Sequence, residues 1–399
     1  MSSSSPVEVV ARKILKKEKH PGLFNGRYRF SPYMACAHRC IYCDGRFEKY
    51  HVKGDFDRDV IARINTAELL SKELPKLREP GPVCISSGVS DPYQPLEGKL
   101  RLTRGAAEIL SEFDHHVVIH TKSSLMLRDL SIWQKVNERT SVTLMISLTM
   151  LDEDLRLLLE PGASKVCERL RLIRECSACG INVGVLAMPF IPYLTDSSEE
   201  LSSFLGEMKK AGARFVIPGL LTLKQGRQKD FFFSALRKGK PELVDTLMKL
   251  YSDNEQWGSA PKAYSKRFYR CTEQVWSRED MDDMVPHELY RGRFALYDEF
   301  VILLRDMITL YSRKGTGVSR LRIAAEKFQR WVSEKRKYCG RRRNLSYRVI
   351  DDFLRVMIHS GELNTLLGNP KLADFLAEVE SGAVFNYRTL QLERKTGDQ

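Results

Sequence analysis

The chain has 399 residues, of which 43% are hydrophobic and 29% charged, and its formal net charge is +13. This composition is that of a folded globular protein, long enough for one barrel-sized domain and a smaller second domain. Its apolar runs are too short for a membrane-spanning helix, and its nine scattered cysteines do not form the pattern of a disulfide framework. We therefore expect a protein of a reducing compartment, the cytoplasm, without membrane association.

The first part of the chain, residues 1–24, predicts a flexible and basic N-terminal arm. Serines and a proline open the sequence, and lysines follow at positions 13, 16, 17 and 19. This stretch has no apolar core of the kind that marks a secretory signal peptide. We expect a polar arm that precedes the first folded domain.

Residues 25–285 alternate short apolar runs with stretches of helical periodicity, the pattern of parallel βα units. Strands are predicted at residues 27–33, 83–89, 116–122, 143–149, 182–190 and 214–221. Helices are predicted after them, at residues 58–77, 103–113, 124–138, 164–179, 197–211 and 241–252. Six βα units are too few for a closed eight-stranded barrel, so we predict an α/β fold with a partial (β/α)6 barrel.

Residues 286–399 predict a separate helical module, because apolar residues recur there at helical spacing and strand-like runs stop. Breaks between helices are predicted at Gly315-Thr-Gly317 and at Cys339-Gly-Arg-Arg-Arg-Asn344. Residues 312–348 contain thirteen Lys and Arg against two Glu, so this block carries a charge of +11 and the rest of the chain is close to neutral. Such a block indicates a nucleic acid as partner; a solvated helical surface is the alternative.

Three cysteines follow the first predicted strand. Cys36, Cys40 and Cys43 are separated by three and two residues. Thiolates at this spacing can hold three corners of a 4Fe–4S cluster on one loop, which leaves the fourth iron open to a cofactor or substrate. Half of a zinc site is one alternative, for which Cys176 and Cys179 are the only matching second pair, and chance proximity is the other. The spacing favours the cluster.

The cysteine loop resembles the radical S-adenosylmethionine (SAM) superfamily, whose signature has this spacing and an aromatic residue, here Tyr42, before the last cysteine. From about residue 25 to 280 the chain is similar to the spore photoproduct lyase group, or DNA repair photolyase-like proteins. The resemblance is carried by residues 31–33 (Ser-Pro-Tyr), 90–97 (Ser-Asp-Pro-Tyr-Gln-Pro-Leu-Glu), 102–104 (Leu-Thr-Arg) and 121–129 (Thr-Lys-Ser-Ser-Leu-Met-Leu-Arg-Asp), and by Glu160-Pro161 with Arg169-Leu170. It implies a 4Fe–4S cluster on the three cysteines, bound SAM with Tyr42 near its adenine, and an external electron donor.

Five further residues are candidate contacts for SAM. The resemblance implies Ser90, Lys122 and Ser147, each of which lies at the carboxyl end of a predicted strand. The zwitterionic end of SAM needs a cation for its carboxylate, which Lys122 can supply, and acceptors for its amine. Asp91 is a candidate acceptor and Arg169 a second cation, but ordinary structural salt bridges explain both equally well.

Two positions depart from the lyase pattern. Gly88 stands where the lyase has a cysteine that returns a hydrogen atom to the product, and Asp44 stands where it has a tyrosine. Cys84 lies four residues before Gly88 on the same strand, about 13 Å deeper at roughly 3.3 Å per residue, and we interpret it as a core residue. Membership of the superfamily is therefore predicted, but repair of the spore thymine dimer is not.

The remaining cysteines raise the question of a second cluster. Cys167, Cys176 and Cys179 are close in sequence, and Cys271 and Cys339 could add ligands. Free cysteine is commonly a small buried hydrophobic residue, so we expect one cluster only.

The sequence thus predicts a lyase-like radical SAM enzyme that reductively cleaves SAM and directs the resulting 5′-deoxyadenosyl radical to a substrate. A nucleic acid is the predicted substrate, contacted through residues 312–348. Two alternatives stay open. One is the same chemistry on a peptide or small molecule, and the other is a non-catalytic nucleic-acid-binding protein that contains a cluster.

Overall fold

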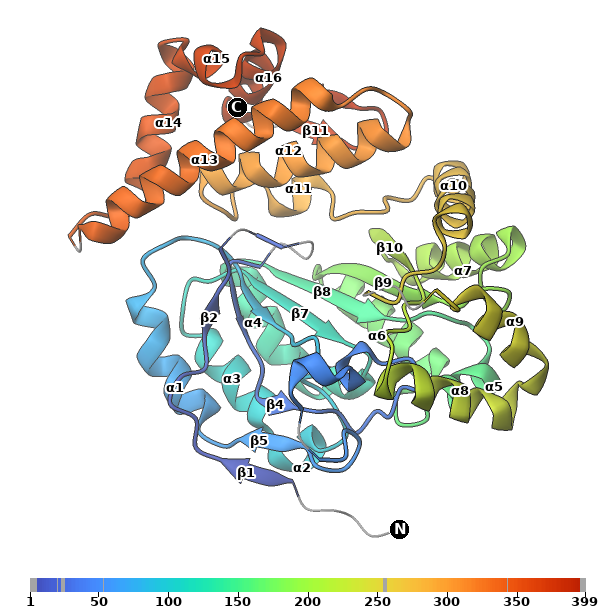
Figure 1. Ribbon diagram of the computed structural model, residues 1–399. Coiled ribbons are helices and arrows are strands. Elements are labelled where there is room, and N and C mark those ends of the chain that lie inside the picture. The colour runs from blue at the N-terminus through green and yellow to red at the C-terminus, as the bar shows by residue number, and fades with distance from the viewer. Residues whose placement is uncertain are drawn as a thin grey trace. The chain divides into compact units, whose positions relative to one another are not determined.

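Figure 1 shows the protein as a computed structural model, which describes residues 6–19, 21–22, 26–52, 54–253, 257–342 and 344–394. The chain divides into two compact units. The first, the sheet unit, comprises residues 1–16, 29–74 and 84–284, and the second, the helical unit, comprises residues 17–28, 75–83 and 285–399. The sequence does not predict that two short segments from the N-terminal part of the chain belong to the helical unit.

A seven-stranded sheet is the centre of the fold, and all six predicted strands lie in it. Its order is β10 (Phe215–Leu220), β9 (Asn182–Phe190), β8 (Val142–Ser147), β7 (Val117–Thr121), β6 (Val83–Ile85), β3 (Tyr28–Phe30) and β2 (Lys16–Lys17). Strands β7 to β10 pair in parallel with their neighbours. The predicted α/β fold with a partial barrel and a helical C-terminal region is confirmed.

The register of the sheet brings two predicted site residues together. Thr121 of β7 pairs with Ile146 of β8, so the next residues, Lys122 and Ser147, follow at the same level of the two strands. Parallel strands end at one edge of a sheet, which is where folds of this type place their chemistry. The carboxyl edge of β7 and β8 therefore fixes the position of the candidate site.

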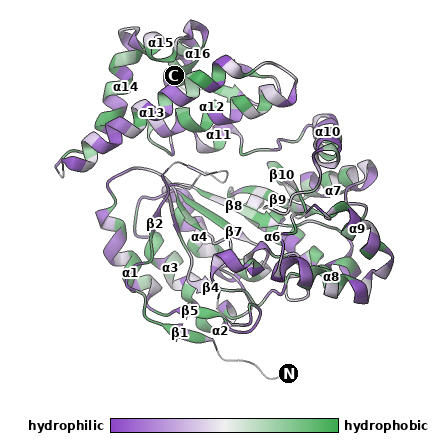
Figure 2. Cartoon of the chain, viewed as in Figure 1, coloured by the Kyte–Doolittle hydropathy of each residue, from purple (hydrophilic) through white to green (hydrophobic). Residues whose placement is uncertain are grey.

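Amphipathic helices cover the outer side of the sheet. Helix α4 (Leu130–Arg139) packs on β8, and α6 (Val166–Ala178) packs on β8 and β9. Helix α7 (Ser198–Ala211) begins at Ser197, which forms a capping box with Glu200, and ends at Gly212, whose φ of 96° favours glycine. Figure 2 shows hydrophobic residues concentrated in the strands, while the helices alternate hydrophobic and hydrophilic residues.

The sheet unit contains helices that were not predicted, among them α5 (Glu153–Leu159), α8 (Arg227–Gly239) and α10 (Lys262–Arg278). It also differs at residues 58–77, where one helix is predicted. The structure has a strand, β5 (Ile61–Arg63), followed by helix α1 (Thr66–Glu73). Strand β5 is the middle strand of a small sheet, between β1 (Val7–Val9) and β4 (Tyr33–Met34). The predicted flexible arm thus contains strands in its described part, whereas residues 1–5, 20 and 23–24 of it lie outside the described residues.

The helical unit is built from α12 (Leu296–Arg313), α13 (Ser319–Arg341), α14 (Val349–His359), α15 (Glu362–Leu367) and α16 (Pro370–Glu380). The predicted break at Gly315-Thr-Gly317 separates α12 from α13. Helix α13 continues through Cys339 and Gly340, so the second break begins later than predicted. A hairpin of β11 (Val384–Asn386) and β12 (Gln391–Glu393) was not predicted.

A network of buried charges joins the short N-terminal segments to α12 and α13. Arg27 forms an ion pair with Asp298, and Arg336 Nη2 lies 2.5 Å from the same carboxylate. Glu79 lies 3.7 Å from Arg27 Nε and 3.8 Å from Arg336 Nε. Arg27, Glu79 and Asp298 are buried, so each depends on the others to offset the cost of leaving water.

In the part of the chain that the structure describes, no helix is both long and apolar enough to cross a membrane.

Candidate active site

The cysteine loop, residues 35–47, follows β4 and curves sharply. Ala35 and Arg39 have positive φ angles of 67° and 61°, a conformation that residues other than glycine seldom adopt. Cys36 and Cys40 are buried, and Cys43 is partly buried. A loop with this backbone keeps its shape only if neighbouring segments hold it, and three of them do.

The first anchor comes from the segment after β6. Ser90 Oγ donates a hydrogen bond of 2.8 Å to the carbonyl of Ala35. Gln94 Oε1 accepts the N–H of Ala37 at 2.9 Å, and its Nε2 donates to the Ala35 carbonyl at 3.3 Å. Ser90, predicted to contact SAM, thus also supports the backbone just before Cys36. Sequence reasoning did not single out Gln94, although it lies in the motif at residues 90–97.

The second anchor is the turn between α5 (Glu153–Leu159) and α6. The N–H of Ile41 donates to the Leu159 carbonyl at 2.9 Å, and the N–H of Gly162 donates to the His38 carbonyl at 2.8 Å. A Cβ atom on Gly162 would lie 2.6 Å from the Ala37 carbonyl oxygen. Only glycine therefore allows the two backbones to approach this closely.

The third anchor lies between β10 and α8 (Arg227–Gly239). Gln228 Nε2 donates to the Tyr42 carbonyl at 2.9 Å. The ammonium of Lys224 forms an ion pair with Asp44 and lies 5.5 Å from the centre of the Phe47 ring. Asp44, which departs from the lyase pattern, therefore has a partner in this chain that fixes the end of the cysteine loop.

Glu160 is the centre of a buried polar network that sequence reasoning missed. Its Oε1 accepts the hydroxyl of Tyr42, and its Oε2 lies 2.5 Å from Arg169 Nη2. Lys122 Nζ lies 3.3 Å from Oε1. Burial acts to raise the pKa of Glu160, but the charges of Lys122 and Arg169 outweigh it and lower the pKa to about 2. The carboxylate is therefore ionised at neutral pH.

Lys122 connects this network to the cysteine loop. Its ammonium lies 3.2 Å from Cys40 Sγ and 3.2 Å from the Tyr42 hydroxyl. Burial raises the pKa of the Cys40 thiol to about 12, and Lys122 acts in the opposite direction. The ammonium beside the sulfur therefore favours the thiolate, the form of cysteine that binds a metal or cluster.

The other predicted contacts lie around the same network. Asp91 accepts the N–H of Lys122 at 2.8 Å and the hydroxyl of Thr121 at 2.7 Å, so it orders the end of β7. Arg169 is fully buried and donates to the Ser147 carbonyl at 2.9 Å as well as to Glu160. These contacts give Asp91 and Arg169 a structural role, and their contact with SAM stays a prediction, as does that of Ser147.

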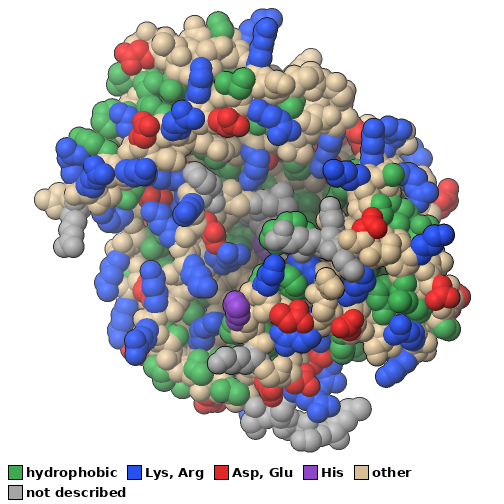
Figure 3. Space-filling view, in the orientation of Figure 1, with side chains coloured by type: hydrophobic (Ala, Val, Ile, Leu, Met, Phe, Trp, Pro, Cys, Tyr) green, Lys and Arg blue, Asp and Glu red, His purple; other side chains and the backbone are tan. Residues whose placement is uncertain are grey.

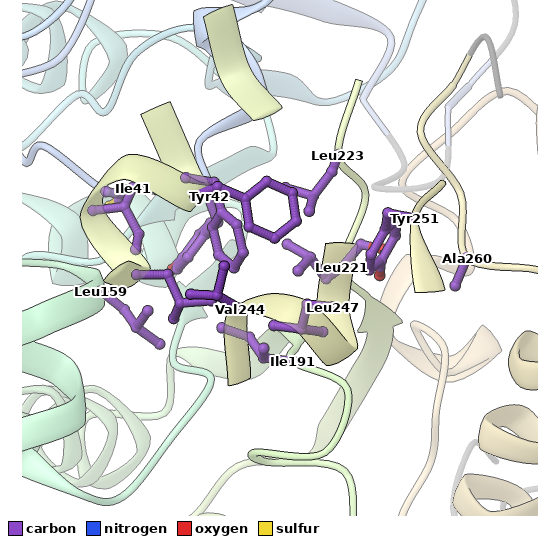
Figure 4. Close-up of a cluster of buried hydrophobic side chains, with 14 of the residues drawn as sticks. Ile41, Tyr42, Leu159, Ile191, Leu221, Leu223, Val244, Leu247, Tyr251 and Ala260 are labelled. Carbon is purple, nitrogen blue, oxygen red and sulfur yellow. The ribbon is translucent and has the colours of Figure 1, made fainter. Parts of the chain in front are cut away.

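Apolar side chains enclose the second half of the cysteine loop. Cys40, Ile41 and Tyr42 belong to one buried cluster with residues of the β9, β10 and α8 segments. We call this cluster the loop core, and Figure 4 labels ten of its members, namely Ile41, Tyr42, Leu159, Ile191, Leu221, Leu223, Val244, Leu247, Tyr251 and Ala260. Packing of this kind limits the access of water to the thiols.

The donor set fits an iron–sulfur cluster. Within the described ranges, no three His, Cys, Asp or Glu side chains converge on a single metal ion. A 4Fe–4S cluster binds each thiolate at a different iron, so its ligands are spaced more widely than those of one ion. Three thiols on one anchored loop, with the Lys122 ammonium 3.2 Å from Cys40 Sγ, supply the type of donor that such a cluster binds.

The remaining cysteines belong to other elements of the chain. On α6, Cys176 is buried and Cys167 is exposed. Cys84 is buried on β6, with its Sγ 3.2 Å from Ser86 Oγ and 3.8 Å from His120 Nε2.

Comparison with known proteins identifies the family. The sequence profile of the radical SAM superfamily matches residues 30–205. The chain is 31% identical over 248 residues to the uncharacterized protein Rv2578c of Mycobacterium tuberculosis. That alignment covers 61% of this chain and 73% of Rv2578c. It is 28% identical over 255 residues to the uncharacterized protein MJ0683 of Methanocaldococcus jannaschii. That alignment covers 62% of this chain and 90% of MJ0683.

Solved structures show a related fold. Spore photoproduct lyase with bound AdoMet and dinucleoside spore photoproduct matches 69% of this chain and 80% of its own, with a TM-score of 0.50 and 16% identity. The protein belongs to the radical SAM superfamily, as its cysteine loop predicts, and shares its fold with this lyase. Enzymes of the family use a 4Fe–4S cluster and SAM and need an electron donor.

We expect the Lys122→Ala protein to bind SAM roughly ten- to hundredfold more weakly while it retains its iron. A charge-assisted hydrogen bond is typically worth about 1.5–3 kcal/mol, and Glu160 keeps Arg169 as its partner in this variant. Calorimetric titration of SAM into anaerobically reconstituted protein measures the change, with the exposed Lys135→Ala as control. An unchanged affinity would count against Lys122 as the partner of the SAM carboxylate.

Proposed function

We propose that this radical SAM enzyme acts on a nucleic acid in a lyase-like reaction, and that the basic face of α13 holds the substrate. When bound and reduced, the cluster and SAM supply a 5′-deoxyadenosyl radical that abstracts a hydrogen atom. The chain's own residues have three tasks in this proposal. The anchored cysteine loop positions the ligands, Lys122 and Glu160 set the charge beside them, and the loop core limits the access of water.

The observation that carries the proposal is a stripe of exposed cations along α13. Arg320, Lys327, Arg330, Lys337 and Arg341 are exposed and recur at helical spacing. The opposite side of the helix is buried through residues such as Phe328 and Val332. Of the exposed acids on α13, Glu334 lies within the stripe and Glu326 beside it. Cations on one side of a long helix match the repeated phosphates of a nucleic acid.

The structure narrows the set of cations that can take this role. Arg336 forms an ion pair with Asp298 within the helical unit. The guanidinium of Arg342 lies 3.8 Å from the centre of the Tyr338 ring. Both side chains therefore already have a partner within the protein. Arg343, part of the predicted basic block, lies outside the described residues. Figure 3 shows Lys and Arg side chains over much of the visible surface, so the proposal rests on the alignment along α13 and not on the overall charge.

The fold adds support of a second kind. The spore photoproduct lyase that shares it is described with a dinucleoside lesion bound, so a partial barrel of this form can present a nucleotide to the cofactor. Gly88 and Asp44 differ from that lyase at positions near the chemistry, so the proposal specifies the class of substrate and not the lesion.

A product screen tests the proposal. Anaerobically reconstituted protein is reduced with SAM in the presence of ultraviolet-irradiated DNA, RNA or a peptide pool, and 5′-deoxyadenosine is quantified in each. We expect the yield to rise with a nucleic acid, together with a new nucleotide product. A rise with peptides alone would replace the proposal with the peptide alternative, and an absence of 5′-deoxyadenosine in every arm would contradict turnover itself.

We expect neutralisation of Lys327, Arg330 and Lys337 by glutamine to weaken nucleic-acid binding most strongly at low salt. Each phosphate contact contributes about −0.9 to the slope of log K against log salt on duplex DNA. The triple variant should therefore flatten the slope by up to about three units. Fluorescence anisotropy over a salt series measures both quantities.

A matched control removes three positive charges from the surface of the sheet unit. Lys135, Lys238 and Lys249 are exposed lysines of the sheet unit, and their triple glutamine variant should leave the slope within about one unit of the wild type. Equal flattening by both triple variants would show that net charge, and not the face of α13, governs binding.

A further inference from the structure

Tyr193 is an exposed aromatic residue at the chemically active edge of the sheet. It follows the end of β9 by three residues, and 48% of its surface is exposed. Its φ of 63° lies in the left-handed region, and its N–H donates to Asp196 Oδ1 at 2.8 Å. A bulky residue in this conformation is strained, and such strain tends to persist where function requires the side chain.

A second tyrosine packs against the first. The rings of Tyr193 and Tyr264 lie 5.2 Å apart at an angle of 68°, an edge-to-face contact. The hydroxyl of Tyr264 donates to Asp196 Oδ2 at 2.7 Å, so one carboxylate fixes both the backbone of Tyr193 and the ring packed against it. Both oxygens of Asp196 thus accept hydrogen bonds from the two tyrosines. We call Tyr193 and Tyr264 the aromatic platform.

Cations flank the platform. Arg267 of α10 (Lys262–Arg278) lies 4.6 Å from the centre of the Tyr264 ring. Lys262, Lys266 and Arg270 of the same helix are also exposed, and residues 262–270 contain no Asp or Glu. This cationic segment lies outside the block at residues 312–348 and belongs to the sheet unit, which also holds the cysteine loop.

The platform is continuous with the site through packing. Tyr264 and Ile191 are buried members of the loop core, which also contains Cys40, Ile41 and Tyr42. Leu194, next to Tyr193, packs against the same cluster. Figure 4 shows Ile191 in this cluster together with Ile41 and Tyr42. The aromatic platform and the cysteine loop therefore share one rigid support.

We propose that Tyr193 stacks on a base of the nucleic-acid substrate and that Arg267 contacts a phosphate beside it. Exposed aromatic rings next to cations are the combination that binds single-stranded or extruded nucleotides, because the ring stacks on the base while the charges track the backbone. The inference rests on the proposed function and adds a contact within the sheet unit itself.

The test separates the base from the phosphate. Full-length reconstituted protein is titrated with oligothymidylate and with an abasic oligomer of the same length, using fluorescence anisotropy. The wild type should prefer the base-bearing strand. The Tyr193→Gly variant should bind oligothymidylate about five- to hundredfold more weakly than the wild type does. Its affinity for the abasic oligomer should be unchanged, and Tyr193→Phe should bind both oligomers as the wild type does.

Tyr193→Gly also distinguishes stacking from a structural role. Glycine tolerates the positive φ, so this variant should unfold at the same or a higher temperature than the wild type while its binding falls. Lower thermal stability accompanied by the same loss on both oligomers would assign Tyr193 to the fold and overturn the proposal. A selective loss of SAM affinity would also overturn it, because the ring would then serve the cofactor.

The phosphate contact has its own variant. Arg267→Gln should weaken the binding of both oligomers equally and flatten the salt slope by about 0.7 units, the contribution of one phosphate contact on a single strand. If the wild type binds nucleic acid but Tyr193→Gly keeps its preference for oligothymidylate, the stacking proposal fails and the proposed function stands. If the wild type binds neither oligomer, both proposals fail together.

Discussion

We expect reductive cleavage of SAM to fall to background when any one of Cys36, Cys40 and Cys43 is replaced by alanine. In the predicted site each thiolate would hold a different corner of the cluster, so loss of one would leave two ligands for a group that needs at least three from this loop. The remaining cysteines belong to other elements of the chain. Chromatography of 5′-deoxyadenosine after chemical reduction measures the effect, and iron analysis shows whether the cluster has formed.

The control for this experiment is Cys176→Ala. Cys176 is buried on α6, so its replacement has a small packing cost but should leave both iron content and cleavage close to the wild type. Loss of a large share of the iron from this variant would mean that a second cluster exists. The expectation of one cluster would then be wrong.

The second large effect is expected at Glu160. Replacement by glutamine keeps the shape of the side chain but leaves Arg169 and Lys122 without their counter-charge in a buried site. Removal of one partner from a buried ion pair typically costs about 3–5 kcal/mol. We expect the free energy of unfolding of Glu160→Gln, measured by urea denaturation under anaerobic conditions, to fall by about this amount.

A neighbouring ion pair provides a matched control. Arg171 and Glu175 lie 2.5 Å apart, the same separation as Arg169 and Glu160, but their side chains are 66% and 37% exposed. Exposed pairs of this kind contribute about 0.3–0.5 kcal/mol, so Glu175→Gln should be nearly neutral. Equal effects of the two substitutions would show that burial does not set the strength of the Glu160 network.

The pH dependence of the same stability has a defined sign. The pKa of Glu160 is lowered from 4.5 to about 2 in the folded protein, so its stabilising effect is present above pH 4.5 and is lost as the pH falls toward 2. Glu160→Gln should remove that part of the acid dependence.

Six of the seven strands of the main sheet could be predicted because strands in its interior form apolar runs, whereas β2, with two exposed lysines, does not. Strand β9 was predicted with both of its bounds, residues 182–190. Strands β5 and β11 lie outside the main sheet, and their three residues mix apolar and polar side chains without a longer apolar run. The predicted helix at residues 58–77 was therefore wrong in its first part, and the hairpin near the C-terminus was missed.

Part of the candidate site could likewise be predicted from the sequence, and part could not. The cysteine loop and Lys122 lie in sequence motifs whose chemistry can be predicted. Gln94 and Glu160 also lie in such motifs, but their role in holding the loop depends on contacts between distant segments. Tyr42 and Glu160 are separated by 118 residues, and Ala37 and Gln94 by 57. Gly162 is required by a close approach of two backbones, which no periodicity of the chain reports. Local patterns thus identify the chemistry, but only the folded chain shows what supports it.

The composition of the helical unit has a consequence for the order in which the protein can fold during synthesis. Its segments at residues 17–28 and 75–83 leave the ribosome early, while α12 and α13 follow only after the whole sheet unit has been made. Arg27 is separated from Asp298 by 271 residues. A nascent chain generally folds domain by domain from its N-terminus, but here these early segments must wait in water, with Arg27 and Glu79 hydrated, until the last quarter of the chain arrives. The helical unit is therefore completed last, although it contains some of the first residues to be synthesised.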